Sequence, residues 1–314
     1  MENIGIQLKG RDLLSLHDYT PEEVEAIINL AGRLKEKQQR GEPHHYLQGK
    51  TLGMIFQKSS TRTRVSFEVG MYQLGGYPMF LSANDLQLGR GESIADTARV
   101  LSRYLDGIMI RTYAQADVEE LARYASIPII NGLTDLLHPC QILADLLTIK
   151  ERRGTLAGLR LAYVGDGNNN ICHSLLYGCA KVGMNISVAS PEGYQPNADI
   201  ARLAGEDALI TGCTVEILTD PSEAVTEADV LVTDVWASMG QEAERADRLK
   251  VFPPYQVNER LAALAKPDFI FLHCLPAHRG EEVTDEIMEG PHTAVWDEAE
   301  NRLHAQKAVL AMLL

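Results

Sequence analysis

Short apolar stretches alternate with amphipathic ones along most of this chain, and no other feature constrains its fold as strongly. The apolar stretches TLGMIF (51–56) and YPMFLS (77–82) are each followed by an amphipathic run, at 62–75 and 93–105, and DGIMIRTY (106–113) comes next. Buried strands that alternate with amphipathic helices are typical of βαβ units, in which helices cover a parallel sheet. The sequence therefore predicts an α/β fold.

The same alternation begins again in the second half of the chain. LRLAYVGDG (159–167) has the pattern of a strand that ends in a glycine turn, NNNICHSLLYGCAKVG (168–183) that of a helix, and MNISVAS (184–190) that of the next strand. ADVLVTDVW (228–236) and DFIFLHCLP (268–276) predict two further buried strands. A chain of 314 residues usually forms more than one domain. We therefore expect two doubly wound domains, each built on a parallel sheet.

Two further segments have the apolar spacing of helices. HPCQILADLLTIKERRG (138–154) lies between the two halves, and its proline suits the first helical position. We expect this helix to bridge the domains. The segment 298–314 is helical by the same criterion, but periodicity leaves open whether it packs on the second half or returns to the first.

Charge and composition exclude several kinds of partner. The chain carries 29 basic and 43 acidic side chains, a net charge of -14, which argues against nucleic acid and anionic membrane surfaces. No apolar run approaches the roughly 18 to 20 residues of a membrane span, and the first residues lack a secretory pattern, so we expect a cytoplasmic protein. The five cysteines are an odd number without C-x-x-C spacing, which predicts thiols and gives no support for a metal site.

The segment SSTRTR (59–64) lies between a predicted strand and a predicted helix, and therefore at a helix N-terminus. The exposed backbone amides of such a terminus favour an anion. Ser60, Thr61, Arg62 and Thr63 add donors that suit a phosphate group. The alternative interpretation is a helix N-cap followed by two solvated arginines.

Polar residues also occur at other predicted strand and helix ends. Arg111 follows the apolar run GIMI, at the carboxyl end of a strand, where open α/β sheets bind their ligands. His138 and Gln141 flank the start of the bridging helix, where a cleft is expected. The alternatives are a surface arginine and a histidine that caps or packs against the helix.

In the second half, a strand runs into glycines and then a helix, as in a dinucleotide-binding loop. Gly165 and Gly167 are present, but Asn170 stands where the third glycine is required, so a nicotinamide cofactor is not expected. The asparagines either satisfy local backbone groups or grip a carboxylate or amine. Asp234 and Cys274 end two other predicted strands, although burial is the usual role of a lone thiol.

Eight motifs occur in a fixed order along the chain: SSTRTR, GRGESIADTAR, IRTY, HPCQ, GDGNNN, DVWASMGQE, HCLPAHRG and DEAENR. In this order they resemble the aspartate/ornithine transcarbamoylase family, from about Asp12 to the last helix, and the acceptor-side motifs are similar to those of its ornithine branch. The resemblance implies transfer of a carbamoyl group from carbamoyl phosphate to L-ornithine, without a cofactor. It also implies a donor domain over 1–137, to which 299–314 returns, and an acceptor domain over 138–298.

The resemblance assigns one set of residues to carbamoyl phosphate: Ser60, Thr61, Arg62, Thr63, Gln87, Arg111, His138, Gln141, Cys274, Leu275 and Arg302. It assigns a second set to ornithine: Asn170, Asp234, Ser238 and Met239. Asn170 is chosen among three asparagines by counting back from His173 and Ser174. Gln87 matches a position that reaches a neighbouring subunit, which implies a homotrimer or a multiple of trimers. Catalytic roles are implied for four residues: Arg62, Arg111, His138 and Cys274.

The same residues also bear on other possible acceptors and activities. An aspartate acceptor carries a second carboxylate and needs extra cations, whereas TDVWASMGQE contains no arginine. Putrescine or a modified ornithine is a smaller departure. A nicotinamide-dependent oxidoreductase is disfavoured by the missing glycine, and a silent binding protein by the retained arginines and Cys274. The sequence leaves open whether the reaction serves arginine synthesis or arginine breakdown.

Overall fold

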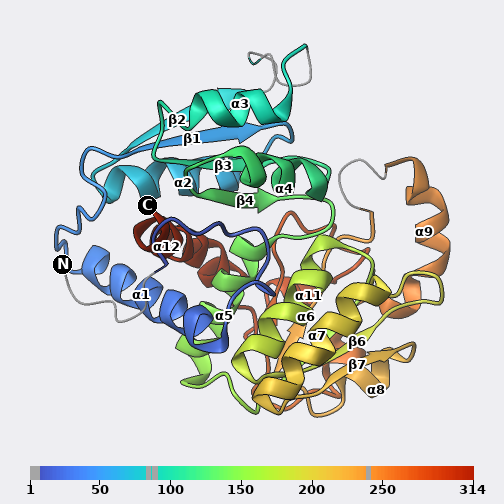
Figure 1. Ribbon diagram of the computed structural model, residues 1–314. Helices are drawn as coiled ribbons and strands as arrows, with labels where there is room; N and C mark the ends of the chain where they lie inside the picture. Colours follow the sequence, from blue (N-terminus) through green and yellow to red (C-terminus); the bar gives the residue numbers. More distant parts are fainter. Residues whose placement is uncertain (1–7, 83–85, 87–90, 238–241) are drawn as a thin grey trace. The chain divides into compact units, whose positions relative to one another are not determined.

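The computed structural model describes residues 8–82, 86, 91–237 and 242–314 (Figure 1). The chain forms two compact units, one of Met1–Leu147 with Glu300–Leu314 and one of Thr148–Ala299. The chain passes between the units within two helices, α5 (Pro139–Arg153) and α12 (Val295–Leu313). The sequence placed the first division at the start of α5 instead. Each unit contains one parallel sheet with helices, so the predicted fold class is confirmed.

The sheet of the first unit has four parallel strands in the order β2-β1-β3-β4. They are β1 (Thr51–Phe56), β2 (Tyr77–Ser82), β3 (Gly107–Arg111) and β4 (Ile129–Leu133). The order reverses between β1 and β3, and Phe56 is paired with Arg111 at the ends of these two strands. Ligands of open parallel sheets bind at the carboxyl ends of strands where the order reverses. The loop that carries SSTRTR and the end of β3 therefore meet at the expected position for a ligand.

Four helices precede α5 in the described part of this unit. They are α1 (Pro21–Gln39), α2 (Thr61–Gln73), α3 (Ile94–Leu101) and α4 (Gln115–Tyr124). Ile108 and Ile110 share a hydrophobic cluster with α3 and α4, because alternate side chains of a strand point to the same face. On α2, Gly70 lies so close to Lys307 of α12 that an added Cβ would approach its Cγ to 3.1 Å. The α2 helix therefore packs closely against α12.

The sequence predicts α2, α3 and three of the four strands in this unit, but it does not predict α1, α4 or β4. The start of α1 has a local signal, since Thr20 and Glu23 form a capping box and Pro21 takes the first helical position. The two side chains satisfy backbone amides that the first turn leaves without helical partners. The missed helix α1 therefore follows from the same rules as the predicted ones.

The sheet of the second unit has five parallel strands in the order β7-β6-β5-β8-β9. They are β5 (Arg160–Val164), β6 (Asn185–Ala189), β7 (Val215–Leu218), β8 (Val230–Val232) and β9 (Ile270–Leu272). The order reverses between β5 and β8. The asparagine-rich turn follows β5 and Asp234 follows β8, so both lie at the expected ligand position of this sheet. Of these strands, only β7 had no predicted counterpart.

The helices of the second unit are α6 (Asn170–Val182), α7 (Ala198–Thr211), α8 (Pro221–Val225), α9 (Arg245–Val251), α10 (Glu259–Ala262) and α11 (Asp285–Met288). Short 3-10 turns occur at Glu242–Glu244 and Pro253–Tyr255. The α6 helix ends at Gly183, whose φ of 70° is left-handed and therefore favours glycine. In the described part of the chain, the helices are too short or too polar for one of them to cross a membrane.

A buried ion pair joins α6 to α7 and gives a test of this packing. Lys181 Nζ lies 2.7 Å from Asp207 Oδ1, and both side chains are almost fully buried. Asp207→Ala should lower the free energy of unfolding by about 3 to 5 kcal/mol, because it leaves a buried ammonium without its carboxylate. The double variant Lys181→Met with Asp207→Leu should unfold nearer to the wild type in urea.

Arg202→Ala provides the matched control, because Arg202 forms an exposed pair with Glu206 on the same helix. Its loss should leave the free energy of unfolding nearly unchanged, because exposed ion pairs contribute little to stability. Equal effects of Asp207→Ala and Arg202→Ala would contradict the importance of the buried pair.

Candidate active site

The N-terminus of α2 has the geometry of an anion site. Ser60 is the N-cap, and its hydroxyl accepts a hydrogen bond from the backbone N–H of Thr63 at 3.2 Å. The first turn contains no acidic residue, so its positive end is not neutralised by its own side chains. Thr63 is fully buried, whereas Ser60 and Arg62 keep more contact with solvent. Backbone amides, hydroxyl groups and positive charge are thus concentrated in one turn.

Buried arginines from other elements lie beside this turn. Arg302 of α12 donates from Nη2 to the hydroxyl oxygen of Thr63 at 2.8 Å, and its side chain is almost fully buried. Arg111, at the end of β3, is also buried. A buried guanidinium group is costly unless hydrogen bonds or an anion stabilise it. This cluster of cations therefore suits a ligand with two negative charges, such as a phosphate ester or acyl phosphate.

His138 lies within the same cluster and is kept neutral by it. Burial lowers the pKa of its imidazole well below the usual range, and the charges of Arg302, Arg111 and Arg62 lower it further. A neutral imidazole carries one N–H donor and one acceptor. His138 can therefore donate a hydrogen bond to a ligand oxygen without adding a fourth positive charge.

Gln141 is fixed by its own helix. Its side-chain N–H donates to Asp145 Oδ1 at 2.9 Å, and both residues are buried in α5. This contact fixes the orientation of the side-chain amide. The structure thus brings together seven residues that the sequence assigned to the donor, all within the first unit: Ser60, Thr61, Arg62, Thr63, Arg111, His138 and Arg302, with Gln141 on the helix that follows His138.

The two arginines of SSTRTR have different surroundings. Arg64 pairs with Glu68 at 3.0 Å, and its guanidinium group lies 3.8 Å from the centre of the Phe80 ring. It therefore belongs to the exposed face formed by α2 and β2. Arg62, in contrast, lies close enough to His138 to lower its pKa. Gln87, the remaining donor residue expected from this unit, lies outside the described residues.

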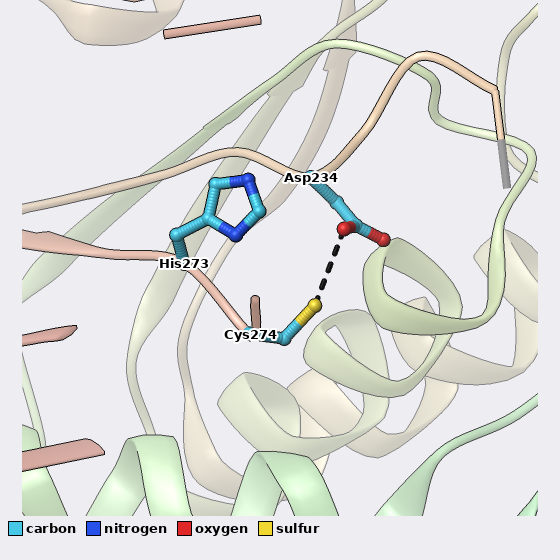
Figure 2. A group of neighbouring side chains, drawn as sticks. All are labelled: Asp234, His273 and Cys274. Atoms are coloured by element: carbon cyan, nitrogen blue, oxygen red, sulfur yellow. Dashed lines mark hydrogen bonds between the residues drawn. The ribbon is translucent and has the colours of Figure 1, made fainter. Parts of the chain in front are cut away.

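In the second unit, two polar side chains meet at the ends of β8 and β9. Cys274 donates from Sγ to Asp234 Oδ1 at 3.2 Å, and Figure 2 shows the ring of His273 beside this pair. Burial raises the pKa of Asp234, although the charge of His273 and the thiol hydrogen bond oppose this rise. A carboxylate with this burial favours a cationic ligand. Ser238 and Met239, which follow Asp234 in the sequence, lie outside the described residues.

The donor atoms of Asp234, His273 and Cys274 lie within 4.8 Å of one another and could hold a metal ion. However, His273 Nδ1 accepts from the backbone N–H of Leu275 at 2.9 Å, and its Nε2 lies 3.2 Å from Glu282 Oε1. Both ring nitrogens thus already have protein partners, so only a carboxylate and a thiol are available to an ion. This donor set does not fit a structural metal, which usually has four protein ligands.

The three asparagines after β5 have distinct positions. Asn169 is the N-cap of α6, and its side-chain oxygen accepts from the backbone N–H of Cys172 at 2.9 Å. Its amide nitrogen donates to the hydroxyl of Tyr163, so both ends of this amide are engaged. Asn168 is exposed, and Asn170, the expected ornithine residue, is the first helical residue and half-buried. Gly167 allows close packing, because a Cβ there would lie 2.4 Å from Ser190 Oγ.

Sequence reasoning missed the buried charged residues that support this site. Arg248 donates from Nη1 to Asp166 Oδ2 at 2.5 Å and to the carbonyl oxygen of Trp236 at 2.7 Å. It thereby joins the turn after β5 to the loop after β8. Charged residues are usually exposed, so their burial has no local sequence signal.

The neutral state of His138 predicts a pH dependence of stability. Because its folded-state pKa lies below the unfolded value of about 6.5, the unfolded chain binds a proton first as the pH falls. The contribution of neutral His138 to stability is therefore fully present above about pH 6.5 and decreases as the pH falls below this value. Between pH 7.5 and pH 5.5, urea unfolding of the wild type should lose about 1 kcal/mol more than that of His138→Gln. Equal losses in the two proteins would contradict a neutral His138.

The difference between the wild type and His138→Gln isolates the contribution of His138, because all other buried histidines are present in both proteins. For example, burial lowers the pKa of His304 to about 3, and His304 is retained in both proteins.

Comparisons with known proteins cover nearly the whole chain. Residues 11–151 match the carbamoyl-P binding domain of aspartate/ornithine carbamoyltransferases, and residues 157–313 match their Asp/Orn binding domain. The ornithine carbamoyltransferase of Carboxydothermus hydrogenoformans is 64% identical, with 98% of each chain covered, and that of Pyrococcus horikoshii is 60% identical, over 98% of this chain and 97% of the relative.

Solved structures agree with these sequence matches. The ornithine carbamoyltransferase structure from Pyrococcus furiosus is similar with a TM-score of 0.95 and 58% identity, and 98% of each chain is covered. That from Gloeobacter violaceus has a TM-score of 0.87 and 54% identity, over 98% of this chain and 99% of the other. The resemblance found in the eight motifs is thereby confirmed. The chain belongs to the aspartate/ornithine carbamoyltransferase family.

Proposed function

We propose that this protein transfers the carbamoyl group of carbamoyl phosphate to the δ-amine of L-ornithine, which gives L-citrulline and phosphate. The observation that carries the proposal is the cationic cluster at the N-terminus of α2, where Arg62 and the buried Arg111 and Arg302 lie near a neutral His138. The carboxylate and thiol at the ends of β8 and β9 support a cationic acceptor.

The first unit would bind the donor. The phosphate group would lie on the α2 N-terminus, held by Ser60, Thr61, Arg62 and Thr63. Arg302 keeps the Thr63 hydroxyl in place.

The carbamoyl end would lie against His138 and Gln141. Because His138 is neutral, its single N–H would donate to the carbonyl oxygen together with Arg111. The oxygen of Gln141 would accept from the carbamoyl amide, since its N–H is engaged by Asp145. The assignment of Cys274 and Leu275 to the same ligand stays a prediction.

The second unit would bind the acceptor. Asp234 and Cys274 would lie beside the δ-amine, and Asn170, with Ser238 and Met239 from the loop after β8, would receive the α-amino and α-carboxylate groups. Arg248, the buried cation near this site, is engaged by Asp166 and the Trp236 carbonyl. It is therefore not available for the second carboxylate of aspartate, which supports ornithine as the acceptor.

The chemical step begins with the neutral amine. A lysine-like amine with a pKa of about 10.4 is neutral in roughly one molecule in 2,500 at pH 7. Deprotonation therefore has a free-energy cost of about 4.6 kcal/mol. Removal of water from the buried ammonium group would lower this cost, and Asp234 would act as the base that accepts its proton. The amine nitrogen then forms a bond to the carbamoyl carbon, and the bond from that carbon to the phosphate oxygen breaks.

Charge then develops on the carbonyl oxygen and on the leaving group. Arg111 and His138 would stabilise the oxygen, and Arg62 the phosphate, which can take up the amine proton. Correct positioning of both substrates can lower the activation barrier by on the order of 7 to 11 kcal/mol, so the reaction needs no covalent intermediate.

Arg62 and Arg64 lie in one motif but have different surroundings, which gives a sharp test. Arg62→Gln should lower kcat/KM for citrulline formation about 100- to 1,000-fold, because it removes a charge that stabilises the departing phosphate. Arg64→Gln should retain nearly wild-type turnover, since Arg64 contacts Glu68 and Phe80. Citrulline is measured with saturating carbamoyl phosphate, and folding is checked by thermal unfolding.

The same assay tests the acceptor when ornithine, putrescine and aspartate are offered in parallel. Citrulline from ornithine alone supports the proposal. A preference for carbamoylation of aspartate would move the protein to the other branch of its family. Wild-type protein that is inactive with all three acceptors would contradict an enzymatic role.

We also propose that the protein forms a homotrimer or a multiple of trimers. The α2 helix exposes Val65, Val69 and Tyr72, and the neighbouring edge strand β2 exposes Tyr77 and Met79. Contiguous exposed apolar side chains on an edge strand and its covering helix favour association with another chain. This face supports an interface between copies, while the number three rests on the family resemblance and on Gln87.

The double variant Val65→Asp with Tyr72→Asp should dissociate the oligomer, because two carboxylates would have to be desolvated in the interface. Sedimentation velocity should then detect monomers, and turnover should fall if a neighbouring subunit contributes Gln87. Leu209→Asp is the control, since Leu209 is 84% exposed on α7 of the other unit. A variant that sediments like the wild type would contradict this interface.

We further propose a cytoplasmic location, which is supported by the state of the cysteines. All five are thiols in the part of the chain that the structure describes, as in most proteins of reducing compartments. The reaction can serve either arginine synthesis or arginine breakdown.

A further inference from the structure

Tyr163 of β5 lies directly beneath the asparagine-rich turn of the second unit. Its side chain is fully buried, and its hydroxyl donates to the backbone carbonyl of Asp166 at 2.9 Å. The same hydroxyl accepts from the side-chain amide of Asn169, also at 2.9 Å. One oxygen atom therefore forms hydrogen bonds to both Asp166 and Asn169 of this turn.

Asn169 connects the Tyr163 hydroxyl to the start of α6. Its side-chain oxygen caps the helix by accepting from the backbone N–H of Cys172, so the hydroxyl of Tyr163 and the cap hold opposite ends of one amide. Asn170 follows as the first helical residue. The orientation of Asn170 therefore depends on how Asn169 is held.

Tyr163 also lies where a ligand of this sheet is expected. It is paired with Val232 of β8, at the position where the strand order reverses, and Asp234 follows two residues after Val232. Burial raises the pKa of Tyr163 well above its usual value, and the carboxylates of Asp234 and Asp166 raise it further. The hydroxyl thus stays protonated at neutral pH and keeps its donor contact.

We propose that Tyr163 is a positioning residue for the acceptor amino acid. Its hydroxyl fixes Asp166 and Asn169 so that Asn170 is directed toward the α-amino and α-carboxylate groups of ornithine. This inference rests on the proposed function and adds a specificity role for a residue that touches no substrate.

Tyr163→Phe removes one buried oxygen atom and leaves the ring in place. We expect KM for ornithine to rise about tenfold, which corresponds to the loss of about one buried hydrogen bond. Both kcat and KM for carbamoyl phosphate should stay within about twofold of the wild type. The inhibition constant of L-norvaline, which is ornithine without its δ-amine, should rise by the same factor as KM, because only the α groups would be affected.

Tyr255→Phe is the matched control. Tyr255 is a buried tyrosine of the same unit, and its hydroxyl donates to the backbone carbonyl of Thr219 at 2.6 Å. It should lose a similar amount of thermal stability but keep the wild-type KM for ornithine. If Tyr163→Phe also keeps the wild-type KM while losing stability, the hydroxyl is only structural and the inference is overturned.

Asn169→Ser provides a second, independent variant. Serine is a good N-cap, so the helix start is retained, but its side chain is too short to reach Tyr163. The same rise in KM is expected, and the double variant with Tyr163→Phe should show no further rise, since both changes break one contact. If Tyr163→Phe does not fold, a wild-type KM in Asn169→Ser overturns the inference. Wild-type protein that forms no citrulline would instead overturn the proposed function itself.

Discussion

Parallel pairing of the strands is the constraint on which both halves of the site depend. It places all carboxyl ends of a sheet at one edge, so residues distant in sequence become neighbours without long loops. In the first unit, pairing of Phe56 with Arg111 brings the α2 N-terminus to the end of β3. In the second unit, the same arrangement brings together the residues that follow β5, β8 and β9. Each sheet thus presents one ligand position where its strand order reverses.

Electrostatics distinguish these two positions. The first unit gathers buried guanidinium groups and keeps His138 neutral, so it favours an anion. The second unit places a buried carboxylate beside a thiol and engages its nearby arginine with Asp166. A molecule with a phosphate group suits the first environment, and a molecule with an amine suits the second. The reaction of an acyl phosphate with an amine combines these two preferences in one enzyme.

The sequence predicted the fold class and most of the strands, because buried strands and amphipathic helices have strong periodic patterns. It placed Arg62, Arg111 and His138 at the ends of predicted elements, where the ligands of a parallel sheet are expected. It could not separate the roles of Arg62 and Arg64, since only tertiary contacts direct Arg64 to Glu68 and Phe80. Buried supports such as Arg248 and Tyr163 were missed for the same reason. Assignment of a substrate depended on the family motifs rather than on periodicity.

The position of Arg302 in the cationic cluster of the first unit has a consequence for how the protein is made. Residues 300–314 belong to the first unit, yet the ribosome synthesises them only after the whole of the second unit. Until α12 is present, Thr63 lacks the hydrogen bond from Arg302, and Gly70 of α2 lacks its close contact with Lys307. In a nascent chain, the cationic cluster of the first unit therefore lacks Arg302 while the second unit is translated. Carbamoyl phosphate would gain its full binding site only after translation has passed α12.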